Sequence, residues 1–415
     1  MVLEVFLLVG AVLLLGFVSD LFFKETRIPG YLILMLTGIL IGPVFNVVPP
    51  ELFIPLSSLV GTLALIIILF DAGLDLNITK VLSEVPSSAL FTLLVFILSA
   101  AFTTGLLYFV FGWNFFHALL MAAVIGGTSS SVVIPVISKL KVSQEVSIML
   151  SLESVVTDVL CIVTALVLIN IINTSSFELD QVVQTLTATF TTAILFGFLF
   201  GVFWIRILHS FYGKSLGYML TLAVLLVLYS VVELLGGSGA IGVLIFSLVL
   251  GNSTLIANLL KMGSDYKLEH TIKSTQTEIT FFVTTFFFVF LGLIISPSVL
   301  ELGAIGIALG IVFVLVLARF LVTTLLSFFN KAIATSKNLI SFMMSRGLAA
   351  AVLAFLPLNQ NPPIVIPSFS EIVFLVIILT AFLSTYASYS TGRVETKEET
   401  PQPAGKPKII STKKS

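Results

Sequence analysis

The sequence predicts an all-α, polytopic membrane protein, and three observations lead to that fold class. Of its 415 residues, 58% are hydrophobic and only 10% are charged, and the mean hydropathy is +1.18. An ordinary soluble domain carries about 25% charged residues. The apolar residues form runs that are long enough to cross a bilayer as helices, and the basic residues gather in alternate loops between those runs.

We expect about thirteen membrane-spanning helices, because each apolar run can cross a hydrocarbon core that is about 30 Å thick. In order, the runs occupy residues 2–22, 29–48, 56–74, 86–111, 115–139, 144–172, 180–212, 216–235, 239–262, 276–296, 298–329, 338–358 and 368–392. The first run has no basic segment before it and no small-residue cleavage site, so we interpret it as a span and not as a signal peptide. Residues 393–415 form a charged tail that we expect to be disordered.

The basic residues predict the orientation of these spans. Eighteen of the twenty Lys and Arg residues lie near the ends of odd-numbered spans, in the loops that follow them or in the tail, and the loops after even-numbered spans contain none. Because basic loops stay on the cytoplasmic side, we expect a multi-pass protein of the cell membrane with its N-terminus outside and its C-terminus in the cytoplasm. The two remaining basic residues, Arg319 and Arg346, lie inside spans.

An odd number of spans suggests two six-span units that enter the membrane from opposite sides. Residues 1–172 and 216–392 would be the two inverted repeats, joined by the linking span within residues 173–215, with the tail at 393–415. Span 5 contains "GGTSSSVVIP" and span 12 contains "SRGLAAAVLAFLP", each with small or polar residues before a proline. Corresponding broken helices indicate a binding site, so we expect spans 5 and 12 to be broken and to cross.

Span 6 carries two acidic residues, Glu153 and Asp158, inside an apolar run. An ionisable group near the bilayer centre costs at least about 2.5–3.5 kcal/mol on insertion scales, so each needs a partner or a function. A separation of five residues places the two acids about 140° apart around a helix. Glu153 aligns instead with Thr157, and Ser154 with Asp158. The span therefore presents two neighbouring polar strips.

Arg346 is the partner that we expect for Glu153, because a buried arginine needs a carboxylate and a buried glutamate needs a cation. That pairing leaves Asp158 without a fixed partner, so Asp158 could bind either a cation or a proton. Arg319 could neutralise the ends of the broken helices or could extend to the membrane interface. The only cysteine, Cys161, and three scattered histidines form no pattern for a disulfide or a metal cluster.

Four motifs resemble the monovalent cation/proton antiporter family, and more narrowly its sodium/proton exchanger branch. "GYLILMLTGILIGP" (30–43) resembles the family's second span and "LFDAGLDL" (69–76) resembles the end of its third. "ESVVTDV" (153–159) is similar to the E-S-x-x-N-D signature of span 6, and "SRGLAAAV" (345–352) to the R-G signature of span 12. The resemblance covers the whole membrane region in matching order.

The resemblance implies a homodimer in which a core domain with two crossing broken helices moves against a dimerisation domain. It matches Asp158 to the aspartate that binds the cation and the proton, and Ser154 to the serine near the cation. Glu153 and Arg346 match the structural ion pair, and Thr128 matches the threonine of the unwound helix. Thr157 replaces the usual asparagine of the branch.

We therefore expect an antiporter, not an enzyme, that exchanges Na⁺ or Li⁺ for H⁺ and contributes to pH homeostasis. Cation and proton would compete at Asp158, and the cation shell would include Ser154, Thr157, Thr128, Ser129 and Ser130. A single free carboxylate favours electroneutral exchange. A K⁺/H⁺ antiporter of the same fold is the main alternative, because Ser129 and Ser130 resemble the potassium/proton relatives. A Na⁺-coupled symporter of an organic anion is a second alternative, and an intramembrane aspartyl protease or a passive channel is further from the pattern. We expect no cofactor, nucleotide or nucleic acid.

Overall fold

The computed structural model describes residues 2–26, 28–45, 57–75, 86–137, 140–174, 179–210, 217–259, 270–294, 301–358, 360 and 363–391. All the elements assigned in these residues are helices. The expected tail at 393–415 lies outside the described residues, as do Arg27, Lys80, Lys139, Lys214, Lys261 and Lys267 of the basic loops. Eight of the described helices are long and apolar enough to cross a bilayer, and three shorter apolar helices accompany them.

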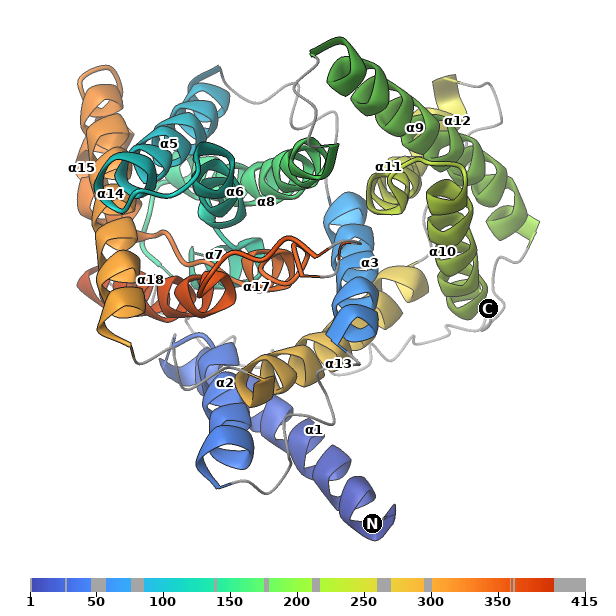
Figure 1. The fold of residues 1–415 in the computed structure, drawn as a ribbon, viewed down its shortest axis with the longest axis horizontal. Coiled ribbons are helices and arrows are strands. Elements are labelled where there is room, and N and C mark those ends of the chain that lie inside the picture. Colours follow the sequence, from blue (N-terminus) through green and yellow to red (C-terminus); the bar gives the residue numbers. More distant parts are fainter. Residues whose placement is uncertain are drawn as a thin grey trace, which may run out of the picture.

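Nine helices form what we call the core bundle, on the left and at the centre of Figure 1. Its long members α5, α6, α8, α14 and α18 pack mainly on one another. In chain order, the core bundle comprises α5 (Pro86–Gly105), α6 (Phe115–Ile125), α7 (Ser130–Ile137), α8 (Gln144–Thr174), α14 (Leu302–Ser327), α15 (Lys331–Thr335), α16 (Lys337–Phe342), α17 (Leu348–Leu353) and α18 (Phe369–Ser390).

The remaining helices form a second body, which we call the outer group, to the right of and below the core bundle in Figure 1. Within it, α11 packs on α9 and α3, and α13 packs on α2 and α3. Its members are α1 (Val2–Thr26), α2 (Tyr31–Ile39), α3 (Ser57–Asp75), α9 (Leu179–Ser210), α10 (Gly217–Leu234), α11 (Gly239–Gly251), α12 (Ser253–Leu259) and α13 (His270–Ile294).

Glycines allow the helices of the outer group to approach very closely. A Cβ atom on Gly38 of α2 would meet the main chain of α13 at Val289 and Gly292, and a Cβ on Gly292 would meet the main chain of α2 at Met35. In a bilayer, where apolar side chains gain little by leaving lipid, such close packing of small residues is a main source of helix association. The pair α2 and α13 therefore behaves as one packed unit.

The helices lie where the hydropathy pattern predicts them. Each of the thirteen apolar runs contains a described helix, and the expected breaks in spans 5 and 12 are present. Residues 126–129 separate α6 from α7, and residues 343–347 separate α16 from α17. A further interruption at Asn252, between α11 and α12, was not expected from the sequence. The boundaries of the inverted repeats remain a prediction.

Candidate functional site

The two broken helices meet at their unwound stretches, in the middle of the core bundle. The amide of Ser129 donates a hydrogen bond to the carbonyl oxygen of Ser345 at 2.8 Å. Thr128, Ser129, Ser345 and Arg346 are all buried. Non-helical backbone at membrane depth is tolerated only where protein encloses it or water reaches it. This crossing therefore needs other polar groups to satisfy its main chain.

Helix α18 supplies two of those groups. The Oγ atom of Ser384 accepts a hydrogen bond from the amide of Met344 at 3.0 Å, and the Oγ1 atom of Thr380 accepts from the amide of Arg346 at 3.1 Å. Thr380 and Ser384 lie four residues apart, on one face of α18. Side chains of α18 therefore accept from amides of the unwound stretch 343–347, whereas the amide of Met343 still donates to the carbonyl oxygen of Leu339 in α16.

Tyr31, at the start of α2, approaches the same stretch from the outer group. Its hydroxyl donates to the carbonyl oxygen of Arg346 at 2.8 Å and lies 2.9 Å from the Oγ atom of Ser345. The crossing is thus fixed from two sides, by α18 and by α2.

Helix α8 brings its polar strips against the other unwound stretch. A Cβ atom on Gly127 would lie 2.8 Å from the carbonyl oxygen of Thr157 and 2.7 Å from the Sγ atom of Cys161. Only glycine leaves room for this approach. The amide of Thr128 donates to the Oγ1 atom of Thr157 at 3.1 Å, so the hydroxyl of Thr157 supports the unwound backbone directly.

Asp158 faces the beginning of α7. Its Oδ2 atom accepts hydrogen bonds from the amide of Ser130 at 3.2 Å and from the Oγ atom of Ser130 at 2.8 Å. The first residues of a helix offer unpaired amides and a partial positive charge, both of which favour a carboxylate. Asp158 is only half-buried, whereas Glu153 is 1% exposed. Of the two acids, Asp158 is the one that an ion can reach.

Glu153 is paired with Arg319, and the expected pairing with Arg346 is wrong. The Nη1 atom of Arg319 lies 2.5 Å from Oε1 of Glu153, and Nη2 lies 2.7 Å from Oε2, which makes a bidentate ion pair. The Nε atom of Arg319 donates to the carbonyl oxygen of Ile340 at 2.5 Å, and its guanidinium carbon lies 5.5 Å from the centre of the Phe91 ring. Every face of this arginine is therefore occupied inside the core bundle.

Arg346 has a different environment, which charge complementarity alone does not predict. Arg346 belongs to the unwound stretch 343–347, where helical periodicity does not predict the direction of a side chain. Arg346 is 2% exposed, and its Nε and Nη1 atoms have no hydrogen-bond partner among the described residues. It interacts electrostatically with both Asp158 and Glu153. Arg346 is thus a buried positive charge beside the acids.

The remaining predicted site residues divide into two sets. Thr128 and Thr157 belong to the Glu153 side, since the Oγ1 atom of Thr128 donates to Oε1 of Glu153 at 3.3 Å and Thr157 donates to the Glu153 carbonyl oxygen at 2.8 Å. Ser130 contacts Asp158 directly. Ser154 is fully buried one turn before Asp158, and its hydroxyl donates to the carbonyl oxygen of Ser151 at 3.0 Å.

Sequence reasoning missed Tyr31, Ser345, Thr380 and Ser384. The pair Thr380 and Ser384 had a usable signal, namely two hydroxyl side chains four residues apart in an apolar span. Tyr31 belongs to the second-span motif at 30–43, but nothing in that motif predicts the direction of its hydroxyl.

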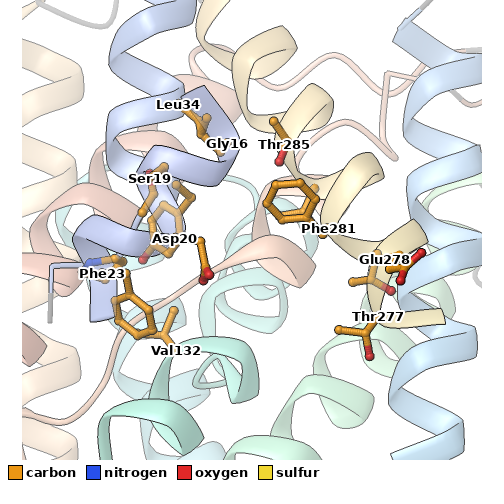
Figure 2. A pocket seen from close by; sticks show the side chains of 15 residues that line it. Gly16, Ser19, Asp20, Phe23, Leu34, Val132, Thr277, Glu278, Phe281 and Thr285 are labelled. Atoms are coloured by element: carbon orange, nitrogen blue, oxygen red, sulfur yellow. The ribbon is translucent and has the colours of Figure 1, made fainter. Parts of the chain in front are cut away.

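A cavity of about 480 Å³ opens beside the crossing, between α1, α2, α7 and α13. We call it the vestibule. Tyr31, Leu34 and Val132 line it near the core bundle, and Val132 lies on α7 only two residues after Ser130. Figure 2 shows Asp20 of α1 and Glu278 of α13 on opposite walls. The vestibule is thus lined by Asp20 and Glu278 and also by α7, the helix whose first residue, Ser130, bonds to Asp158.

Comparison with known proteins agrees with this architecture. Residues 9–390 match the family model described as "Sodium/hydrogen exchanger, transmembrane". The Na(+)/H(+) antiporter 1 of Methanocaldococcus jannaschii is 26% identical over 316 residues, which cover 73% of this chain and 72% of that protein. The K(+)/H(+) antiporter NhaP2 of Shewanella sp. strain ANA-3 is 27% identical over 408 residues, covering 95% of this chain and 68% of that protein.

The fold is also that of a solved structure. The sodium proton antiporter MjNhaP1 from Methanocaldococcus jannaschii superposes with a TM-score of 0.74 at 24% sequence identity, covering 93% of this chain and all of that one. The family match spans nearly the whole described region, including both broken helices and the acids of α8. This chain therefore belongs to the transmembrane sodium/hydrogen exchanger family.

Proposed function

We propose that this chain is an antiporter that exchanges Na⁺ or Li⁺ for H⁺ across the cell membrane, with Asp158 as the exchanging group. The observation that supports this proposal most strongly is that Glu153 and Asp158 have different environments. Glu153 is buried and neutralised by Arg319 through a bidentate pair, whereas Asp158 is half-buried and, among the described residues, accepts hydrogen bonds only from Ser130. One carboxylate is therefore available to an ion.

The oxygen atoms around Asp158 support binding of a monovalent cation. Alkali cations prefer hard oxygen ligands, and the Oγ atom of Ser130 and the carbonyls of the unwound stretch 126–129 lie next to the carboxylate. Ser129, Thr128, Thr157 and Ser154 would contribute hydroxyl or carbonyl oxygens after small rotations. In the proton-loaded form, the carboxyl group of Asp158 would donate a hydrogen bond to the Oγ atom of Ser130, which donates to the ionised form.

A single exchanging carboxylate also favours electroneutral transport. Asp158 holds either one monovalent cation or one proton, so both loaded forms of the core bundle carry the same charge. The charges of Arg319, Arg346 and Glu153 would stay the same through the transport cycle. Each exchange of one cation for one proton then moves no net charge across the membrane.

Alternating access would come from movement of the core bundle against the outer group. The vestibule reaches α7 at Val132 and would be the path on one side of the membrane. The basic loops favour the cytoplasm for that side, with the N-terminus outside and the C-terminus inside. We also propose that two copies of the chain assemble as a homodimer through the outer group, which the family resemblance implies.

Replacing Asp158 by Asn tests this function. Asn keeps the size of the side chain and its hydrogen bond to Ser130 but cannot exchange a proton, so Na⁺-driven pH change in proteoliposomes should disappear. Glu145→Gln is the matched control, because Glu145 is an exposed acid on the same helix and its bond with Asn330 survives as an amide contact. Retained exchange by Asp158→Asn would falsify the proposal.

K⁺/H⁺ exchange is the second candidate, favoured by the similarity to the K(+)/H(+) antiporter NhaP2 along 95% of this chain. The serine and threonine oxygens near Asp158 are compatible with either cation. Imposing Na⁺, Li⁺ and K⁺ gradients in turn on the same proteoliposomes separates the two. Proton movement with Na⁺ and no organic solute would also exclude obligatory symport with an organic anion.

A further inference from the structure

The hydroxyl of Tyr31 crosses the boundary between the outer group and the core bundle. Resting on the proposed antiport, we propose that Tyr31 is a latch that holds the conformation in which the vestibule is open. The latch engages the unwound stretch of span 12, at the point where the two broken helices meet. Tyr31 would then be a positioning residue that sets how long the ion site stays accessible from the vestibule.

The ring of Tyr31 belongs firmly to the outer group. It stacks on the ring of Phe288 in α13, with centroids 4.9 Å apart and planes inclined by 18°. Two turns after Tyr31 in α2 and one turn after Phe288 in α13, Gly38 and Gly292 bring the two backbones into contact. The ring therefore has little freedom to follow the core bundle if the core bundle moves.

The hydroxyl of Tyr31 is bonded to the core bundle. It lies 2.9 Å from Oγ of Ser345 and donates to the carbonyl oxygen of Arg346 at 2.8 Å. Ser345 in turn accepts the amide of Ser129 through its carbonyl oxygen, so the latch engages both unwound stretches. Any sliding of the core bundle against α2 must break these bonds, and Tyr31 is only 8% exposed, so the freed groups would lack water.

The position of the ring links the latch to access. Tyr31 lines the vestibule together with Leu34 and Val132, whereas Thr277 and Glu278 at the other end are exposed. In this structure, the bond to the core bundle and the open cavity occur together. Losing the bond should therefore reduce the fraction of molecules in which the inner vestibule is open.

A second tyrosine makes a similar but weaker connection. The hydroxyl of Tyr389, near the end of α18, donates to the carbonyl oxygen of Thr26 at the end of α1, at 2.7 Å. Tyr389 is 59% exposed, so water can replace this bond at little cost. The buried Tyr31 bridge should dominate, with Tyr389 adding a smaller effect of the same sign.

A buried tyrosine that only stabilises its own helix group provides the matched control. Tyr218 of α10 donates to the Oε1 atom of Gln276 in α13 at 2.6 Å, and both helices belong to the outer group. Tyr218→Phe removes an equally buried hydroxyl without touching the boundary. Any change that is specific to Tyr31→Phe then reports on the boundary and not on the general loss of a hydrogen bond.

The test measures the opening of the vestibule directly. Cys161 is the only cysteine, so a Cys161→Ala background accepts single reporters at Thr284, half-buried in the vestibule wall, and at Thr277, exposed at its mouth. The ratio of the two labelling rates with a membrane-impermeant maleimide reports how often the inner vestibule is open. Tyr31→Phe should lower this ratio about five-fold, the population change for a net hydrogen bond of about 1 kcal/mol.

In the same variant, the apparent KM for Na⁺ on the vestibule side should rise by a similar factor, with a smaller change in the maximal rate. Tyr218→Phe should leave both quantities unchanged. An unchanged labelling ratio in Tyr31→Phe would overturn the latch, whether or not exchange is intact. Should that variant fail to fold, Ser345→Ala removes the Oγ contact of the same bridge and should lower the ratio by a smaller factor, because the bond to the carbonyl oxygen of Arg346 remains. An unchanged ratio in Ser345→Ala would then contradict the latch.

This result is distinguishable from failure of the proposed antiport. If Asp158→Asn abolishes exchange while Tyr31→Phe has the same labelling ratio as the unmodified background, only the latch proposal is contradicted. If the unmodified chain moves no protons with Na⁺, the antiport is lost, and the labelling ratio still shows whether Tyr31 controls the vestibule.

Discussion

The two acids of α8 differ because their surroundings differ. Glu153 is bonded by the guanidinium of Arg319 and the hydroxyl of Thr128, so its charge is neutralised within the core bundle. Asp158 faces the start of α7 and remains partly accessible. Both acids lie on α8 within one apolar run, and the helical offset between them directs each to a separate strip of that helix. This division allows one short segment to supply both a structural charge and an exchangeable one.

Breaking the Glu153–Arg319 pair should strongly destabilise the core bundle. Arg319→Gln leaves a glutamate that is 1% exposed without its bidentate partner, and removing one partner of a buried pair typically costs about 3–5 kcal/mol. We expect a large decrease in the thermal unfolding temperature in detergent. Arg206→Gln, which removes an exposed arginine of α9, should leave that temperature nearly unchanged.

The double variant Glu153→Gln, Arg319→Gln sharpens this prediction. It removes both charges, so no buried charge stays unpaired, and part of the lost stability should return. If Arg319→Gln unfolds at the temperature of the unmodified chain, the pair has no structural role.

At the residue scale, the sequence was sufficient to single out the ionisable groups but not to pair them. Burial and the helical offset separate Glu153 from Asp158 correctly. Two arginines lie inside spans, and both could satisfy a buried glutamate on charge alone. The choice between them depends on the direction of Arg346 in an unwound stretch, which no helical periodicity describes.

The broken helices are the elements that create the site. The chain is not helical at residues 126–129 and 343–347, which are small or polar for the most part. Side chains of α8, α18 and α2 form hydrogen bonds with backbone groups there. The sequence predicts both breaks, because small residues before a proline at corresponding places of two halves weaken a helix. The sequence does not predict which neighbouring hydroxyls compensate for them.

Gly127 tests how closely α8 must approach the first break. An alanine Cβ there would lie 2.8 Å from the main-chain oxygen of Thr157, which cannot move without shifting α8. We expect Gly127→Ala to cost about 1–3 kcal/mol and to slow exchange, because Thr157 and Asp158 would move together. Thermal unfolding and proteoliposome flux measure the two effects.

Gly105 provides the control, because a Cβ atom there meets nothing within 4 Å. Gly105→Ala should leave exchange unchanged and stabilise α5 slightly, since alanine favours a helix over glycine. Equal behaviour of the two variants would show that the approach of α8 to Gly127 has no importance for the site.

On the scale of the whole molecule, a core bundle that carries the proposed ion site is packed beside an outer group whose helices approach closely at glycines. Hydropathy predicts where the helices lie, because it reports which residues can contact lipid. It does not predict which helices belong together, because lipid-facing and protein-facing apolar residues look alike in a sequence. The Tyr31 bridge and the vestibule arise at this scale, which is why motif reasoning missed them.

A simultaneous measurement of Na⁺ and H⁺ flux in proteoliposomes, under imposed membrane potentials of either sign, tests the single-carboxylate mechanism most directly. One exchanging carboxylate predicts one proton moved for each Na⁺, with an exchange rate that does not depend on the potential. A flux ratio other than one, or a rate that follows the potential, would show that a second group exchanges protons and that Asp158 does not act alone.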